Sequence, residues 1–263
     1  MGPSKIGVFD SGIGGLPLAF AIRNTFPSHD IIYFGDTEHF PFGDRSSDSV
    51  ERFSHAMAKF LLDEGCDVLV IACNTASAVA YNSLKATFGS QAVILNVIDP
   101  VVREVCNSAA NHIGVIGTSR TIETNIFAQK ITEMSEGKSV SSLATPLLAP
   151  MIESGYYHHP VSKLIVQDYL NHDSFKTIEG LVLACTHYPL IREDIESVCE
   201  NRFVMFDAHN ALVSALQGYL EKDDMVPRGS TTFYVSDLTR TFQKTAEIFA
   251  GGPVDLRQHR LEL

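Results

Sequence analysis

The feature that most constrains the fold is an alternation of short apolar runs with longer stretches of helical periodicity. The apolar runs lie at residues 5–10, 30–36, 67–73, 92–98, 112–118, 139–145, 180–185, 202–207 and 231–237. Residues 47–64 show the intervening pattern, because apolar side chains recur there every three or four positions. Strands that are apolar on both faces and alternate with helices predict parallel sheets covered by helices on both sides.

Two pairs of similar segments occur in the same order along the chain. IGVFDSGIGG at 6–15 is echoed by IGVIGTSRTI at 113–122, and VLVIACNTAS at 68–77 is echoed by GLVLACTHYP at 180–189. One such pair is common among buried strands, but two pairs in matched order indicate two similarly built lobes. We therefore predict an α/β fold of two similar, doubly wound parallel-sheet lobes, with the active site in the cleft between them.

The predicted lobes divide the chain at two points. The first lobe comprises residues 1–97 and 208–263, because the C-terminal tail holds a helix pattern, a strand and another helix that return to it. The second lobe comprises residues 98–207. Cys73 ends a strand of the first lobe and Cys185 ends a strand of the second. Ligands of such folds bind beyond the carboxyl ends of the strands, so we expect both thiols to line the cleft.

Composition narrows the class of function. The formal net charge is −11 and the sequence has no cluster of lysine and arginine, which argues against nucleic-acid binding. No apolar run approaches the ~18 residues that cross a bilayer, and no signal-peptide pattern opens the sequence, so we expect a cytoplasmic protein without membrane contact. The five scattered cysteines include no C-x-x-C pair, which indicates reduced thiols and no metal site. Cys66, Cys106 and Cys199 are interpreted as structural.

The segment DSGIGGL at 10–16 is a strand end followed by a glycine-rich turn. It lacks the third glycine of a dinucleotide fingerprint, since Pro17 stands there, and it lacks the Gly-Lys-Ser/Thr of a Walker loop. Its backbone N–H groups either bind a small anion at a helix start or are capped by Asp10 or Ser11. Asp10 itself is a carboxylate at the end of an apolar strand, where it needs a partner or a task.

The two cysteine motifs share one arrangement. Each thiol ends a strand, and polar residues follow where a helix is expected to begin; a helix N-terminus lowers the pKa of a thiol. The amides and side chains of Asn74, Thr75 and Thr186 are suited to binding a carboxylate. His187 lies two residues after Cys185, near enough to tune a proton carrier there. A single cysteine is more often structural than catalytic, but a pair on matching strands indicates two proton carriers.

Weaker candidates lie in three further segments. Thr118 and Thr121 either donate hydroxyls to the cleft or cap a helix predicted over residues 121–131. Gly43, in a Pro/Gly loop, is placed to present its amide to a ligand. Glu153 follows an apolar run, and a glutamate in that setting is usually solvated.

Together these motifs resemble those of the glutamate racemases, cofactor-independent enzymes that make D-glutamate for bacterial cell walls. The resemblance runs over nearly the whole chain and rests on IGVFDSGIGGL, YFGDT, ACNTASA, IGTSRTI, LACTHYPLI and FYVSD. It implies an isomerase of peptidoglycan synthesis, and so of cell-wall biogenesis and cell shape, that uses glutamate and no cofactor. Dimers are common in the family, so the resemblance admits a homodimer, although no segment indicates an interface.

The resemblance also implies roles for individual residues. Cys73 would take the α-proton from D-glutamate with help from Asp10, and Cys185 would take it from L-glutamate with help from His187 and Glu153. The positions that match substrate contacts of the family are Asp10, Ser11, Phe42, Gly43, Asn74, Thr75, Thr118, Thr121, Thr186 and His187.

The sequence departs from the family pattern in one loop. The usual Pro-Tyr-Gly is Pro41-Phe42-Gly43 here. The missing phenol hydroxyl bears on loop closure and on neighbouring polar groups, whereas contacts made through backbone amides would remain.

Three alternatives stay open at the level of sequence. The first is a racemase of the same superfamily that acts on aspartate or another amino acid. The second is a two-lobed amino-acid-binding protein without turnover, although binding alone needs no paired thiols. The third is a thiol redox protein, which the wide spacing of the cysteines disfavours.

Overall fold

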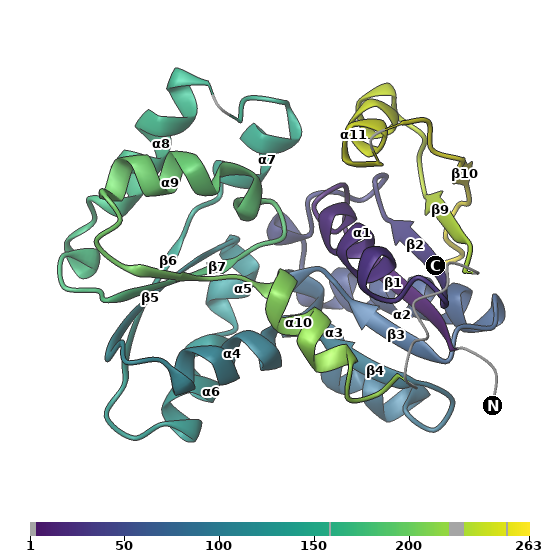
Figure 1. Ribbon diagram of the computed structural model, residues 1–263, viewed down its shortest axis with the longest axis horizontal. Coiled ribbons are helices and arrows are strands. Elements are labelled where there is room, and N and C mark those ends of the chain that lie inside the picture. Colours follow the sequence, from purple (N-terminus) through teal and green to yellow (C-terminus); the bar gives the residue numbers. More distant parts are fainter. Residues whose placement is uncertain (1–3, 158, 221–228, 251) are drawn as a thin grey trace. The chain divides into compact units, whose positions relative to one another are not determined.

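The computed structural model describes residues 4–157, 159–220, 229–250 and 252–263, which form an α/β structure with two parallel sheets (Figure 1). The chain divides into two compact units, residues 1–97 with 209–263, and residues 98–208. The predicted α/β class with two parallel-sheet lobes is confirmed.

The larger unit is built on a six-stranded sheet with the order β10-β9-β2-β1-β3-β4, in which all pairings are parallel. Its strands are β1 (Lys5–Asp10), β2 (Asp30–Gly35), β3 (Val68–Ile71), β4 (Val93–Asn96), β9 (Thr231–Val235) and β10 (Leu256–Gln258). Its helices are α1 (Leu16–Thr25), α2 (Ser47–Asp63), α3 (Asn74–Phe88), α10 (Ala208–Leu216) and α11 (Arg240–Ala250).

Helices cover both faces of this sheet. The β1-to-β2 and β2-to-β3 connections run in opposite directions across it, and right-handed crossovers then place α1 and α2 on opposite faces. Met57 of α2 and Leu84 of α3 pack with Phe9 of β1 in one apolar core. Phe20 of α1 packs against Phe233 of β9, with ring centroids 5.3 Å apart.

The smaller unit is built on a four-stranded parallel sheet with the order β6-β5-β7-β8. Its strands are β5 (His112–Gly117), β6 (Ser139–Ala144), β7 (Gly180–Ala184) and β8 (Val204–Phe206). Its helices are α4 (Ile98–Asn107), α5 (Ser119–Glu123), α6 (Ile126–Met134), α7 (Leu148–Glu153), α8 (Pro160–Leu170) and α9 (Arg192–Cys199). In Figure 1, α8 and α9 lie on one side of this sheet and α4 and α6 on the other. Ile152, Val166 and Ile195 contribute to one apolar core with Leu183 of β7.

The internal repeat of the sequence corresponds to one strand order present in both units. The order β2-β1-β3-β4 in the larger unit matches β6-β5-β7-β8 in the smaller one. The first echoed segment forms the inner strand, β1 or β5, and the second forms its neighbour, β3 or β7. Cys73 and Cys185 therefore follow equivalent strands.

Two elements differ from the sequence-based expectation. Strand β10 was not predicted, because its residues Arg257 and Gln258 are polar and form no apolar run. Both are exposed in the structure. The helix predicted over 121–131 is two helices, α5 and α6, with Asn125 between them in the left-handed region at a φ of 56°. The hydroxyl of Thr124 donates to the carbonyl of Thr121 at 2.7 Å and so competes with continued helical hydrogen bonding.

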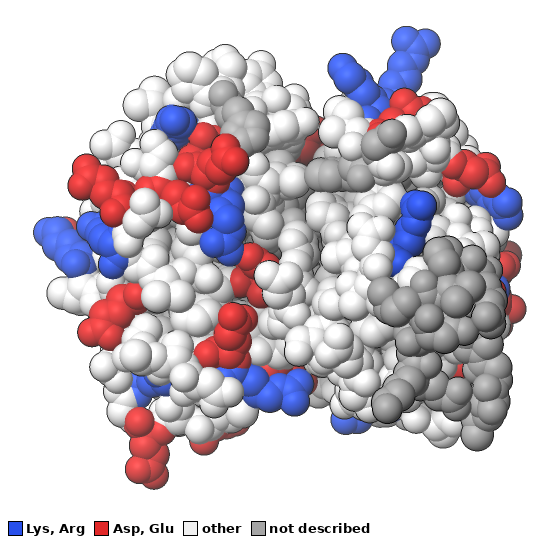
Figure 2. Space-filling model, viewed as in Figure 1, with Lys and Arg blue, Asp and Glu red and all other residues white. Residues whose placement is uncertain are grey.

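Figure 2 shows acidic and basic side chains interspersed over the face drawn there, without a continuous basic area among the described residues. No described helix is both long enough and apolar enough to cross a membrane. All five cysteines are free thiols.

Candidate active site

In the larger unit, predicted site residues follow the carboxyl ends of two paired strands. Asp10 is the last residue of β1, and Cys73 comes two residues after the end of β3. The register places Phe9 opposite Ile71, so the two strand ends lie side by side. The thiol of Cys73 donates to the hydroxyl of Ser11 at 3.6 Å, which brings two of the predicted residues into contact.

Cys73 is also the N-cap of α3. Its backbone is extended, and the N–H of Ala76 donates to Sγ at 3.4 Å. The helix predicted to begin after this cysteine is therefore confirmed. A helix N-terminus and an N–H donor aimed at sulfur both favour negative charge on that atom.

Asn74 and Thr75 form the first turn of α3 and are only 4% and 2% exposed. Nδ2 of Asn74 is buried and has no hydrogen-bond partner among the described residues. A buried polar atom left in this state costs about 1–3 kcal/mol, so Asn74 is placed to gain from a ligand that accepts a hydrogen bond.

Asp10 closes the glycine-rich turn from within. The N–H groups of Gly12 and Gly15 both donate to Oδ2 at 3.1 Å. The turn was predicted either to bind a small anion or to be capped by Asp10 or Ser11, and these two amides are capped by Asp10. Gly15 is required by close approach, because a Cβ there would lie 2.7 Å from Cβ of Asp10.

Phe42 and Gly43 begin a short 3-10 helix, Phe42–Asp44, and both are buried. The ring of Phe42 is 1% exposed, lies 5.5 Å from the ring of Phe53 and belongs to the same apolar core as Cys73. Because the ring is enclosed in that core, the backbone of this segment is what remains for a ligand.

In the smaller unit, three of the predicted residues form a continuous chain of contacts. Sγ of Cys185 lies 3.7 Å from Nδ1 of His187, and Nε2 of His187 lies 2.5 Å from Oε2 of Glu153. His187 is 2% exposed and Glu153 is 21% exposed. Glu153 is the last residue of α7, so it comes from a different element than the cysteine. Although a glutamate in that setting is usually solvated, Glu153 is only partly exposed and contacts the imidazole.

The environment of His187 favours its protonated form. Burial opposes the charge, but hydrogen bonds to Cys185 and Glu153, and the negative charges of both groups, outweigh that opposition. The pKa of His187 is consequently raised well above its ordinary value.

No α-helix begins directly after Cys185, which corrects the sequence-based expectation. A 3-10 helix, Tyr188–Ile191, follows the turn, and α9 begins only at Arg192. Cys185 therefore has an imidazole beside its sulfur, where Cys73 has the amide of Ala76.

Thr118 and Thr121 lie at the same sheet edge as Cys185. Thr118 follows Gly117 of β5, which pairs with Ala184 of β7, and it is the N-cap of α5. Its Oγ1 accepts from the N–H of Thr121 at 3.3 Å and lies 2.9 Å from Oγ1 of the same residue. The hydroxyl of Thr118 thus caps the helix, one of the two roles considered for it, and the hydroxyl of Thr121 contacts that cap. Thr186, next to Cys185, is 6% exposed.

Two buried tyrosines support the site and were not singled out from the sequence. The hydroxyl of Tyr33 donates to the carbonyl of Gly12 at 2.6 Å, beneath the glycine-rich turn. The hydroxyl of Tyr188 lies 2.7 Å from Oγ1 of Thr145, and its pKa is raised by burial and by the charge of Cys185. Tyr33 lies in the motif YFGDT and Tyr188 in ACTHYP, but the supporting role of each becomes evident only from its hydrogen bonds in the structure.

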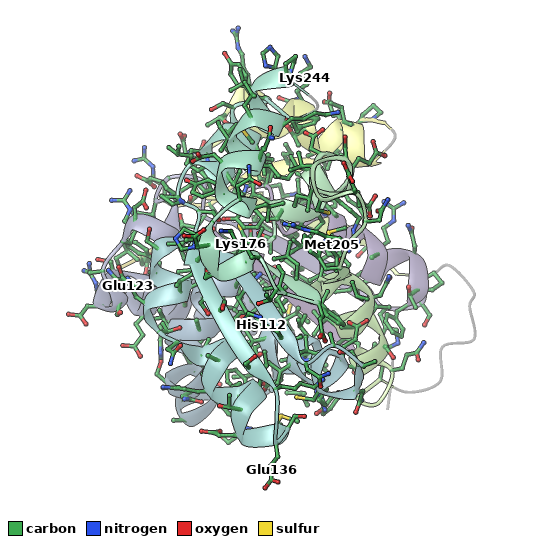
Figure 3. The ribbon with its side chains drawn as sticks, turned by 90° about the vertical axis from the view of Figure 1, so that its left-hand side faces the viewer. His112, Glu123, Glu136, Lys176, Met205 and Lys244 are labelled. Carbon is green, nitrogen blue, oxygen red and sulfur yellow. The ribbon has the colours of Figure 1, made fainter. Side chains whose placement is uncertain are left out.

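The amino-terminal edge of the smaller sheet, opposite the edge that holds Cys185, is stabilised by hydrogen bonds of a histidine. His112, labelled in Figure 3, begins β5 and lies 2.9 Å from the hydroxyls of both Thr177 and Ser141. These bonds tie together the amino-terminal ends of neighbouring strands. The candidate catalytic groups of this unit gather at the carboxyl edge, where ligands of parallel sheets bind.

Among the described residues, no group of three or more His, Cys, Asp or Glu side chains is arranged to hold a metal ion. The chemistry that these groups can perform is proton transfer and hydrogen bonding to a carboxylate. Thiols, an imidazole and carboxylates transfer protons, and amides and hydroxyls donate hydrogen bonds to a carboxylate.

The family model for Asp/Glu/Hydantoin racemases matches residues 18–216 of the chain. A glutamate racemase of Aquifex aeolicus (strain VF5) is 36% identical over 252 residues, covering 95% of this chain and 96% of that protein.

Solved structures give the same result. The chain is similar to a glutamate racemase from Francisella tularensis subsp. tularensis SCHU S4 in complex with D-glutamate, with a TM-score of 0.89, 32% identity and coverage of 99% of this chain and 98% of that one. It is also similar to the glutamate racemase from Aquifex pyrophilus, with a TM-score of 0.81, 38% identity and coverage of 96% and 98%.

Proposed function

The chain belongs to the glutamate racemase family, and on that premise we propose that it interconverts L- and D-glutamate with Cys73 and Cys185 as paired acid and base. Membership makes the chain an amino-acid racemase, so the binding-protein and redox alternatives are set aside. The observation that carries the proposal is the pair of thiols on equivalent strands, each with its own activating groups.

The reaction itself calls for two proton carriers. Inverting the α-carbon requires removal of a proton from one face and delivery of a proton to the other. When no cofactor absorbs the carbanion, a thiolate on one side takes the proton while a thiol on the other side gives one, and the roles exchange in reverse. Cysteine suits this work because its ordinary pKa lies near neutrality and responds to its surroundings.

On the side of Cys73, the proposal assigns activation to the start of α3. The N–H of Ala76 and the hydroxyl of Ser11 lie within hydrogen-bond distance of Sγ. Asp10, held by two amides of the turn, presents a fixed carboxylate on the neighbouring strand. We assign Cys73 to removal of the α-proton from D-glutamate, with Asp10 assisting.

On the side of Cys185, the proposal assigns activation to His187 and Glu153. The imidazole bridges the thiol and the carboxylate, so a proton on His187 is held near Sγ by Glu153. This arrangement resembles a Cys-His pair whose base is oriented by a third group. We assign Cys185 to removal of the α-proton from L-glutamate.

Substrate binding is assigned to the polar groups around the two thiols. The free Nδ2 of Asn74 is a donor for a substrate carboxylate, and Thr75 and Thr186 are buried beside the cysteines. Donors aimed at that carboxylate would also stabilise the charge that develops when the α-proton leaves. The remaining proposed contacts are Ser11, Phe42, Gly43, Thr118, Thr121 and His187.

We assign the biological role to peptidoglycan synthesis, as the supply of D-glutamate, and the location to the cytoplasm. The free state of all five cysteines agrees with a reducing compartment. No cofactor is part of the proposal.

The two-thiol proposal is tested by alanine substitution of each cysteine against a buried cysteine of the same unit. Cys73→Ala and Cys185→Ala are each expected to lower kcat by about 10³-fold or more, because one proton carrier is lost. Cys66→Ala and Cys199→Ala are the matched controls, since these thiols are 3% and 4% exposed in the same two apolar cores as the catalytic pair.

Racemisation is followed by chiral chromatography, and the unfolding midpoint of each variant confirms that it is folded. Turnover of either catalytic variant at the rate of its control would refute the two-thiol mechanism. The same assay run on aspartate and other amino acids tests the substrate, and faster racemisation of aspartate than of glutamate would refute the assignment to glutamate.

A further inference from the structure

A second buried carboxylate lies at the carboxyl edge of the larger sheet and takes no part in the proposed proton transfers. Asp36 directly follows β2 and Ser236 directly follows β9, in strands that pair Gly35 with Val235. Both residues are 0% exposed. A carboxylate in this position requires donors, and burial raises its pKa while hydrogen bonds from Ser236 and His39 oppose that rise.

The donors come from two directions and tie a loop to the sheet. Oγ of Ser236 donates to Oδ1 of Asp36 at 2.7 Å and accepts from the N–H of Glu38 at 2.9 Å. Nδ1 of His39 lies 2.9 Å and 3.0 Å from the two oxygens of Asp36. The hydroxyl of Thr37 adds a pair of bonds to the backbone of the residue after Ser236.

His39 then connects this network to the Phe42–Gly43 segment. Its ring stacks on Phe53 of α2 with centroids 4.1 Å apart and planes 22° apart, and Phe42 packs on the same ring. Nε of Arg45 donates to the carbonyl of His39 at 3.1 Å, which closes the loop on the far side of Gly43. His39 therefore touches the sheet-edge carboxylate and the aromatic ring that seats Phe42.

From this arrangement, and resting on the proposed function, we propose that His39, held by Asp36 and Ser236, is a positioning residue. It fixes the Phe42–Gly43 segment in the conformation that contacts substrate. The Asp36 carboxylate orients the imidazole, and the imidazole in turn packs the ring of Phe53 against Phe42. His39 has no place in the proton transfers themselves.

Two substitutions separate the two contacts of His39. His39→Asn keeps an N–H donor at the place of Nδ1 and removes the stacking ring, whereas His39→Phe keeps a ring on Phe53 and removes the donor to Asp36. His55→Phe is the matched control, because His55 lies in the same unit, bonds Oγ of Ser83 at 3.0 Å and has its ring 5.6 Å from that of Phe88. Both of these contacts of His55 are made to residues of α3, outside residues 37–46.

The expected result is a change in KM rather than in kcat, because the segment contributes to binding in ground state and transition state alike. His39→Phe is expected to raise KM for glutamate by about tenfold in both directions with kcat within about twofold, and His39→Asn to recover part of the loss. His55→Phe is expected to leave both constants unchanged. A KM within about twofold of wild type in His39→Phe, or the same change in His55→Phe, would overturn the proposal.

Amide hydrogen exchange distinguishes failure of this inference from failure of the proposed function. Residues 37–46 are expected to exchange faster in His39→Phe than in wild type, and not in His55→Phe, whether or not the protein turns over glutamate. If wild type does not racemise glutamate, the proposed function fails, and the exchange result alone then upholds or overturns the loop-positioning role. Unchanged exchange in His39→Phe overturns that role even in an active enzyme.

Discussion

At the scale of single residues, burial does not distinguish the two proposed catalytic cysteines from the structural ones. Cys73 and Cys66 are 4% and 3% exposed, and both belong to the same apolar core. What differs is the polar environment, because Cys73 has an amide and a hydroxyl at its sulfur. Around Cys66 burial dominates and raises the pKa of the thiol to about 12, which leaves it protonated at neutral pH.

The contact between His187 and Glu153 predicts a pH dependence that Glu153→Gln would alter. Replacing the carboxylate by an amide removes a negative charge and weakens a hydrogen bond that raise the pKa of His187, while the opposing effect of burial remains. We therefore expect the pKa of His187 to fall in the variant. NMR titration of the imidazole measures this directly, with Glu136→Gln, an exposed loop position, as the control.

The same substitution has a signed effect on stability. The folded-state pKa of His187 is raised, so the stability that the pair contributes is fully present below the unfolded pKa of about 6.5 and is lost as pH rises through the raised value. The difference in unfolding free energy between wild type and Glu153→Gln should thus be largest in mildly acid solution and shrink as the pH rises from there. A difference that grows with pH would contradict this assignment.

At the scale of secondary structure elements, the turn between β1 and α1 depends on an absent side chain. Gly15→Ala would place Cβ 2.7 Å from Cβ of Asp10 and 3.1 Å from Cβ of Ala72, so either the turn or the end of β1 must shift. We expect a loss of about 1–3 kcal/mol in the free energy of unfolding, as for other overpacked sites. Activity should fall as well, because Asp10 is displaced.

Chemical denaturation and racemisation assays on the same variant measure both effects. Gly252→Ala is the control, since a Cβ at that position meets nothing within 4 Å. If Gly15→Ala has the stability and activity of wild type, the close approach of residue 15 to Asp10 does not matter for folding or function, and the prediction is contradicted.

The sequence predicted the elements well where hydrophobic pattern decides them. The nine apolar runs are all strands, and the helix predicted over 47–64 is α2, residues Ser47–Asp63. Helix breaks caused by side chains that bond the backbone were less predictable. At the break between α5 and α6, the hydroxyl of Thr124 donates to the carbonyl of Thr121. The polar strand β10 carries no apolar signal and depends on pairing with β9.

The candidate site was predictable to a similar degree and for related reasons. Cysteines and a carboxylate at strand ends mark a site by position alone, which singles out Asp10, Cys73 and Cys185. The same signal is present at Asp36, which also follows an apolar strand. Its partner His39 lies only three residues on, but Ser236 comes from a distant segment, and only the fold brings Ser236 to Asp36. Glu153 was predictable only through resemblance, because its hydrogen bond to His187 spans two elements.

At the scale of the whole molecule, the two units repeat one strand order yet supply their thiols differently. Cys73 caps an α-helix, whereas Cys185 is followed by a turn and a 3-10 helix and has His187 at its sulfur. A reaction between enantiomers is served by two similar halves, and the different activating groups predict unequal kinetic constants in the two directions. The equilibrium between the enantiomers is unaffected, because a catalyst does not change it.

The central claim is that two different thiols handle the α-proton, and its most direct test is racemisation in D₂O from unlabelled L-glutamate. Each thiol carries a single proton that exchanges with solvent, so the carrier that delivers to the carbanion brings deuterium. We predict that D-glutamate formed in the first turnovers carries α-deuterium, while the remaining L-glutamate stays almost unlabelled. Early product that keeps its original α-hydrogen, or label appearing equally in both enantiomers from the start, would contradict the account.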